Sequence, residues 1–143
     1  MPVTDSRPRR SFRPLLALTI GYTLVLVFAT HYPEPGRLLG PNPPSDKTLH
    51  LLAYGTLGLL TAAALAASGR WSLRSLAGLA TGLAAFAAAD EITQPWFGRS
   101  AEPLDWACDL AGLAAGIAAV AAARWWRHRA ARGLGSRPRR SVQ

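Results

Sequence analysis

The chain has 143 residues, half of them hydrophobic, and carries a formal net charge of +8 at pH 7. This length allows one domain at most, and the single cysteine, Cys108, excludes an internal disulfide. The sequence contains no nucleotide-binding loop, zinc-ligand spacing or nucleophile elbow, so it carries none of these enzyme signatures.

The first apolar segment runs from Pro14 to Tyr32 and contains no Asp, Glu, Lys or Arg. A helix needs about 20 mostly apolar residues to cross ~30 Å of hydrocarbon, so this segment predicts a membrane-spanning helix. A cleaved signal peptide is the competing interpretation, because a basic stretch precedes the segment and VFAT offers a weak cleavage site. The length of the segment favours the span.

The second apolar segment, Thr48 to Gly69, is also long enough to span a membrane. Ser45 suits the N-cap of this helix, and Asp46 favours the positive end of the helix dipole. Polar residues then recur at steps of three and four, which places one set of side chains on a single helical face. This set is Lys47, His50, Tyr54 and Gly58.

The third and fourth apolar segments, Ser75 to Ala89 and Leu110 to Ala123, are uncharged but too short to span a membrane alone. They reach spanning length only if the third continues through Gln94 and the fourth begins near Leu104. We therefore expect four spanning helices, with several acids at or below one membrane boundary. A soluble protein with alanine-rich helices is the alternative, but LVLVFAT and LLTAAALAA lack the polar stripe that a soluble helix would show.

The basic residues predict the orientation of these helices. All but Arg37, Lys47 and Arg99 of the 16 lysines and arginines lie before the first segment, between the second and third, or after the fourth. Basic residues concentrate in the cytoplasmic loops of membrane proteins, so we expect both termini in the cytoplasm. Every acid except Asp5 then lies toward the outer side.

The predicted fold class is therefore all-α, a polytopic membrane protein with four transmembrane helices in a compact bundle. We expect a basic cytoplasmic segment over residues 1–13, a four-helix membrane domain over 14–125, and a basic, disordered cytoplasmic tail over 126–143. The arginines of the tail could touch anionic lipid headgroups. We interpret them as a topology signal and expect no nucleic-acid partner.

Glycine pairs predict how the helices pack. In lipid, small residues let helix backbones approach one another, and three of the predicted helices carry glycines three or four residues apart. These are Gly55 and Gly58, Gly78 and Gly82, and Gly112 and Gly116. We expect all three pairs to lie at helix interfaces, in a bundle with no room for a wide pore.

The acids form the most unusual feature of the sequence. Asp105 and Asp109 share a face with the glycine pair of the fourth helix, so they should point into protein. Asp105 suits a first turn, as Asp46 does, but Asp90 and Glu91 lie near a helix C-terminus, where the dipole disfavours acids. Ionisable groups at membrane depth indicate a functional site. We expect Lys47 to contact at least one of the acids at positions 90, 91, 105 and 109, with Arg99 at the rim of the cluster.

Two stretches resemble the VanZ-like membrane proteins, a family named for a factor linked to teicoplanin resistance. DKTLHLLAYGTLG matches on one helix, and DEITQ, a following Arg and LDWACDLAGLAAG match on the next two. The resemblance covers about residues 46–116 and marks Asp46, Lys47, His50, Tyr54, Asp90, Glu91, Gln94, Arg99, Asp105, Asp109 and Gly112. The chain departs from the family in having Asp109 where Asn is common, and Pro95 directly after Gln94. The resemblance implies a multi-pass protein of the bacterial inner membrane connected with the cell envelope, and it implies no particular activity.

Two classes of function follow from these residues. In an enzyme that modifies a lipid or envelope precursor, the candidate acid–base residues are Glu91, His50 and Asp90. The candidate ligand-binding residues are then Asp46, Lys47, Tyr54, Gln94, Arg99, Asp105 and Asp109. No residue is assigned as a metal ligand and no cofactor is identified, although clustered acids could hold a divalent cation. The expected partners are membrane lipids and an envelope-precursor or glycopeptide-like ligand.

The alternative is a non-enzymatic protein. The same polar residues could bind an amphiphilic ligand, stabilise a partner protein, or form a structural salt-bridge network, since such networks also perturb ionisable groups. A proton or ion path is a third hypothesis. The absence of polar residues from the inner halves of the predicted helices disfavours it.

Overall fold

A computed structural model describes residues 11–33, 40 and 44–135 of the chain. Within these ranges the chain is helical and contains no strand. It forms helices α1 (Phe12–Thr30), α3 (Asp46–Ala67), α4 (Leu73–Thr93) and α5 (Pro103–Gly135), with a short 3-10 helix, η1 (Gln94–Phe97), between the last two. By length and composition, four helices of the described residues can cross a membrane, which confirms the four predicted apolar helices.

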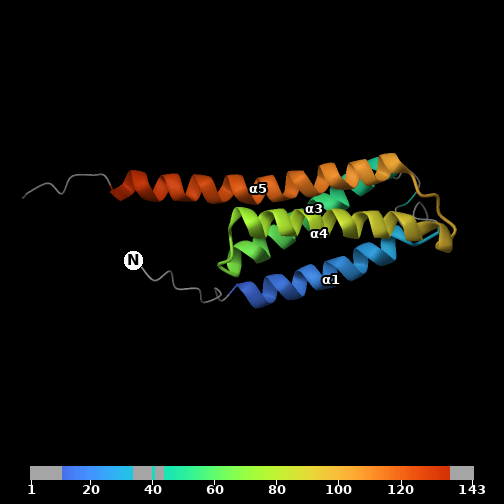
Figure 1. Ribbon diagram of the computed structural model, residues 1–143, viewed down its shortest axis with the longest axis horizontal. Coiled ribbons are helices and arrows are strands. Elements are labelled where there is room, and N and C mark those ends of the chain that lie inside the picture. Colours follow the sequence, from blue (N-terminus) through green and yellow to red (C-terminus); the bar gives the residue numbers. More distant parts are fainter. Residues whose placement is uncertain (1–10, 34–39, 41–43, 136–143) are drawn as a thin grey trace, which may run out of the picture.

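The helices run antiparallel in sequence order, so α1 begins and α5 ends at the same end of the bundle (Figure 1). At the other end, α1 finishes close to the start of α3, and α4 leads through η1 into α5. The polar ends of these helices are far apart in the sequence, but this arrangement brings them together at one end of the bundle.

Helices α3 and α5 form the closest contact in the bundle. A Cβ atom added to Gly58 would lie only 2.6 Å from the carbonyl oxygen of Leu113. A Cβ on Gly112 would meet the carbonyl oxygen of Leu51, and one on Gly116 would meet that of Gly55, both closer than real atoms approach. Backbone therefore lies directly against backbone, which confirms the predicted role of the glycines in these two helices.

The prediction was wrong for the glycines of α4. A Cβ added to Gly78 or Gly82 would have no neighbouring atom of the described residues within 4 Å. The buried residues of α4 are instead Ala87, Asp90 and Glu91, all in its second half. The physical reason is that α3 and α5 already use their glycine faces against each other, so no closely matching backbone surface is left for α4.

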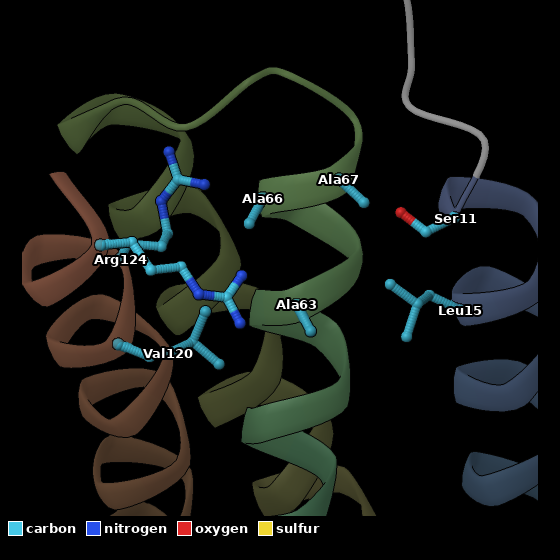
Figure 2. Close-up of a pocket in the computed structure, with 9 residues that line it drawn as sticks. Ser11, Leu15, Ala63, Ala66, Ala67, Val120 and Arg124 are labelled. Carbon is cyan, nitrogen blue, oxygen red and sulfur yellow. The ribbon is translucent and has the colours of Figure 1, made fainter. Parts of the chain in front are cut away.

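Helix α1 packs against α3, on the side of α3 that faces away from α5 (Figure 2). Leu26 joins Tyr54, Leu57, Ala87 and Leu113 in the hydrophobic core, which therefore draws on all four long helices. The Tyr22 hydroxyl donates a hydrogen bond to the carbonyl oxygen of Ala53 at 2.8 Å. This bond fixes the position of α1 along α3.

Helix α5 differs from the prediction at its C-terminal end. We expected a disordered tail from residue 126, but the helix continues to Gly135. Arginine and alanine are good helix formers, and cations suit a helix C-terminus. The Arg129 guanidinium also lies 4.3 Å from the ring centre of Trp125, one turn earlier. The rest of the predicted tail, and residues 1–10 of the predicted N-terminal segment, lie outside the described residues.

Candidate functional site

Helices α3 and α5 begin, and α4 ends, at one end of the bundle (Figure 1). A cluster of polar side chains lies there. We call it the polar cluster. Its members are Asp46, Lys47, His50, Tyr54, Asp90, Glu91, Gln94, Arg99, Glu102, Asp105 and Asp109, linked by the hydrogen bonds and ion pairs described below. All ten candidate site residues from the sequence thus lie at this end.

The start of α3 sets the positions of the first members. Ser45 caps the helix, as predicted, because its hydroxyl oxygen accepts a hydrogen bond from the backbone N–H of Thr48. His50 and Tyr54 then follow one turn apart, with their rings nearly parallel at 3° and their centres 6.5 Å apart. Both side chains are buried and point away from solvent toward α4 and α5.

His50 pairs with Asp109 across the α3–α5 interface. The His50 Nδ1 atom lies 2.9 Å from Asp109 Oδ1, and both side chains are almost fully buried. Asp109 precedes Gly112 by three residues, so the close backbone contact at Gly112 also brings this carboxylate against α3. The second oxygen, Asp109 Oδ2, is buried and has no hydrogen-bond partner in the described part of the chain.

Asp90 joins three helices through its carboxylate. The Tyr54 hydroxyl of α3 donates a hydrogen bond of 2.8 Å to Asp90 Oδ2. The Thr30 hydroxyl of α1, which also reaches the carbonyl oxygen of Leu26, lies 3.1 Å from Asp90 Oδ1. His31 Nδ1 is 3.6 Å from the same oxygen. Asp90 is therefore well satisfied by neighbouring donors, which explains how an acid is tolerated at this helix end.

Glu91 is held differently from its neighbour. Its Oε2 atom accepts a 3.1 Å hydrogen bond from Gln94 Nε2, and its Oε1 atom accepts one from the backbone N–H of Glu102. The residue is 5% exposed. Among the described residues, no Lys or Arg forms an ion pair with Glu91 or Asp90, so hydroxyl, amide and backbone donors hold both carboxylates, with His31 beside Asp90.

Two cations lie at the rim of the cluster. Lys47 Nζ is 2.9 Å from Glu102 Oε2 and 3.2 Å from Asp105 Oδ1. Arg99 donates a hydrogen bond of 2.7 Å to Asp46 Oδ2. The contact predicted for Lys47 is confirmed at Asp105, and Arg99 lies at the rim as expected. The Lys47–Glu102 pair is largely exposed, so it contributes little to stability.

The sequence did not identify the contribution of α1 to this site. Besides Thr30, His31 links α1 to α4, because its Nε2 atom lies 2.9 Å from the Thr93 hydroxyl oxygen. Glu102 was also not assigned to the site. The sequence did hold a clue to the role of α1. Thr30 and His31 are polar residues at the end of an otherwise apolar span, and the predicted topology puts that end at the same membrane face as the acids.

An apolar pocket of about 340 Å³ opens beside the polar cluster. Ala88, Ile92, Pro103 and Trp106 form most of its wall, and Glu91 and Glu102 also line it. Glu91 therefore belongs both to the buried cluster and to the pocket. The pocket offers an almost wholly apolar surface with two acidic residues among its lining, which suits a molecule with an apolar part and a polar group.

A second pocket, of about 260 Å³, lies between α1, α3 and α5 at the opposite end of the bundle (Figure 2). Small side chains of α3 line it, with Arg124 and Arg127 of α5 beside them. The Arg124 guanidinium stacks on the ring of Trp71, 4.7 Å from its centre. None of the candidate site residues lies here, so the two ends of the bundle differ in charge and chemistry.

The polar cluster can support two kinds of chemistry. A buried histidine beside carboxylates can transfer protons, and two groups of three side chains could hold a metal ion. These groups are His50, Glu91 and Asp109, and Asp46, His50 and Asp105, each with ligand atoms within 4.8 Å of one another.

Comparison with protein-family models, curated proteins and solved structures finds no match to this chain. Its function is therefore argued from the residues and geometry of the polar cluster and of the pocket beside it.

Proposed function

We propose that this chain is a VanZ-like multi-pass protein of the bacterial inner membrane. In this proposal, its polar cluster binds or acts on an amphiphilic lipid or cell-envelope precursor at the outer membrane face. One observation carries the proposal: Glu91 lines the apolar pocket and also belongs to the buried polar cluster. The sequence resemblance adds the connection with the envelope.

The outward faces of the helices support insertion into a membrane. Leu24 and Phe28 of α1 are 68% and 64% exposed, and Leu52 of α3 is 60% exposed. Soluble monomers rarely expose large contiguous apolar surfaces, whereas lipid tails would cover these side chains. Each of the four long helices described also has the length and hydropathy of a span.

The distribution of basic residues supports an orientation with the polar cluster outside. The test is a pair of reporter fusions, one after Gly36 in the first loop and one after Gln143. We expect the first fusion to report the outer side and the second to report the cytoplasm. If both reporters lie on the same side of the membrane, the proposed topology is wrong.

The pocket indicates the class of ligand. Apolar side chains fill most of its wall, so it suits an acyl or prenyl chain. Glu91 and Glu102 are the acidic residues among its lining, and a carboxylate oxygen can accept a further hydrogen bond from a hydroxyl or amine group of a headgroup. We assign proton exchange with the ligand to Glu91, because it is the member of the His50, Glu91 and Asp109 group that lines the pocket.

A structural role is favoured for the other parts of the cluster. Asp90 accepts hydrogen bonds from α1 and α3, and Asp46 and Asp105 are engaged by Arg99 and Lys47. These contacts hold the ends of the helices together. We therefore assign the function to Glu91 and His50, and the support of the site to the residues around them.

The experiment measures membrane abundance and phenotype together for Glu91→Gln, His50→Ala and Asp46→Asn. Abundance is measured by immunoblot, and phenotype by glycopeptide sensitivity and by a profile of lipids and wall precursors with and without the gene. Glu91→Gln keeps the side-chain shape, so we expect normal abundance but at least a tenfold loss of the gene-dependent change in the profile. We expect the same loss for His50→Ala.

Asp46→Asn is the matched control, because Asp46 is a rim carboxylate outside the pocket. We expect it to retain most of the phenotype. The proposal fails if Glu91→Gln keeps full activity. It also fails if activity falls only in proportion to abundance, since the cluster would then be structural.

A further inference from the structure

Three buried side chains from three different helices converge at the centre of the polar cluster. His50 comes from α3, Glu91 from α4 and Asp109 from α5, and they are 4%, 5% and 1% exposed. One potential ligand atom from each lies within 4.8 Å of the other two. A ring nitrogen and two carboxylate oxygens are a ligand set that divalent transition metals accept.

An unpartnered oxygen points to a ligand at this position. Asp109 Oδ2 is buried and accepts no hydrogen bond from the described residues, although Asp109 Oδ1 is paired with His50. Both oxygens of Asp90 and both oxygens of Glu91, by contrast, have donors. A buried acceptor without a partner is costly, and a bound cation would satisfy this one.

The local charge favours the same conclusion. Asp90, Glu91 and Asp109 lie together in the buried part of the cluster, and the cations Lys47 and Arg99 are engaged at the rim instead. Among the described residues, His31 and His50 are the only ionisable groups that could carry a positive charge beside these three carboxylates. A divalent cation would offset the excess of buried negative charge.

The distances fit a shared metal ion. Bonds from zinc to nitrogen or oxygen are about 2.0–2.2 Å long, so two ligand atoms on one tetrahedral ion lie about 3.3–3.6 Å apart. The ligand atoms of this group lie within 4.8 Å of one another, so each side chain would move by less than about 1 Å to bind one ion. Such shifts are within the range of side-chain rotation at the ends of helices.

A second group, Asp46, His50 and Asp105, has similar spacing but fits less well. Asp46 is already paired with Arg99, and Asp105 with Lys47. One oxygen of Asp46 and one of Asp105 already lie against these cations, so a metal ion there would compete with both ion pairs. Asp105 Oδ1 of the second group is also buried without a hydrogen-bond partner among the described residues, but Lys47 Nζ lies 3.2 Å from it, whereas no described ion pair involves Asp109 Oδ2.

We infer that His50, Glu91 and Asp109 bind one divalent transition-metal ion, with Zn²⁺ as the best match to their mixed nitrogen and oxygen ligands. Because Glu91 also lines the apolar pocket, an ion at this position borders the space where a ligand would enter. This inference rests on the geometry of the three residues and does not depend on the identity of the molecule that occupies the pocket.

The test uses the full chain, purified in detergent and stripped of metal with a chelator. Zn²⁺ alone is titrated by calorimetry, and Co²⁺ alone is titrated by visible absorption as a second probe of nitrogen and oxygen ligation. We expect one Zn²⁺ per chain. We also expect Asp109→Asn and Glu91→Gln each to weaken binding at least tenfold, because each removes one ligand charge while keeping the side-chain shape.

Asp46→Asn separates the two candidate groups. If the inference is correct, its affinity for Zn²⁺ equals that of the wild type. If Asp46→Asn loses binding while Asp109→Asn retains it, the ion belongs to the other group and the inference is overturned. Thermal unfolding of each variant establishes that it is folded, and if Asp109→Asn does not fold, Glu91→Gln decides the result.

The inference also fails if the folded wild-type protein binds neither Zn²⁺ nor Co²⁺. That outcome would leave the proposed function intact, because a ligand could still bind in the pocket through hydrogen bonds to Glu91. Conversely, metal binding without any change in lipid or precursor profile would support this inference and contradict the proposed function.

Discussion

Helices α4 and α5 each carry two glycines four residues apart, yet the two pairs have different surroundings. In α5, Gly112 and Gly116 lie against the backbone of α3, where no side chain could fit. In α4, no packing atom from the described part of the chain lies within 4 Å of where a Cβ of Gly78 or Gly82 would be. A small-residue pair therefore permits a close helix contact but does not select it.

The two helices are consequently held in the bundle by different forces. Close backbone packing holds α5 against α3 along several turns. Helix α4 has only Ala87, Asp90 and Glu91 buried, so two of its three buried residues are acids. Hydrogen bonds from Tyr54 and Thr30 to Asp90 therefore attach α4 to the bundle, whereas glycine contacts attach α5.

The largest expected effect comes from filling the α3–α5 contact. Gly116→Leu would place a branched side chain against the backbone of Gly55 and Leu59, which cannot move aside without separating the helices. We expect a loss of about 3 kcal/mol or more of unfolding free energy, at the upper end for overpacked interiors. The measurement is thermal unfolding in detergent micelles, together with membrane abundance. Equal stability of Gly116→Leu and wild type would show that α3 and α5 are not in close contact.

A smaller effect is expected when the polar attachment of α4 is removed. Asp90→Ala leaves the buried Tyr54 hydroxyl without its acceptor, and an unsatisfied buried group costs about 1–3 kcal/mol. A double-mutant cycle with Tyr54→Phe isolates this bond. We expect a coupling energy of at least about 0.5 kcal/mol between the two positions. Coupling near zero would mean that Asp90 does not attach α4 to α3.

The sequence predicted this end of the bundle well because helical spacing determines which residues share a face. His50 and Tyr54 on α3, and Asp109 on α5, are buried on the faces that their spacing assigned to them. Charge complementarity added the contact between Lys47 and Asp105. Helical spacing and charge complementarity can both be read from the sequence, so they predict these residues without knowledge of the tertiary arrangement.

The sequence could not show which helices would contact one another. Thr30 and His31 lie at the end of an apolar segment, and only the position of α1 beside α3 and α4 brings them to Asp90. The open glycines of α4 have the same explanation, because packing partners are chosen by the whole bundle. The continuation of α5 to Gly135 reflects helix propensity and a Trp125–Arg129 contact that outweigh its high polarity.

The smallest expected effect is that of Gly82→Ala in α4, and it tests the comparison most directly. The added methyl group meets nothing within 4 Å, and alanine is a better helix former than glycine. We expect a free energy of unfolding within about 0.5 kcal/mol of the wild type, with any change in the stabilising direction.

The matched substitution Gly116→Ala meets the backbone of α3 and should lower stability, because neither helix can yield there. Thermal unfolding of both variants in the same detergent gives the comparison. If Gly82→Ala is destabilised as much as Gly116→Ala, the glycine face of α4 must contact a surface outside the described residues of this chain. A second copy of the chain would then be the first candidate, and a mass measurement in detergent would reveal it.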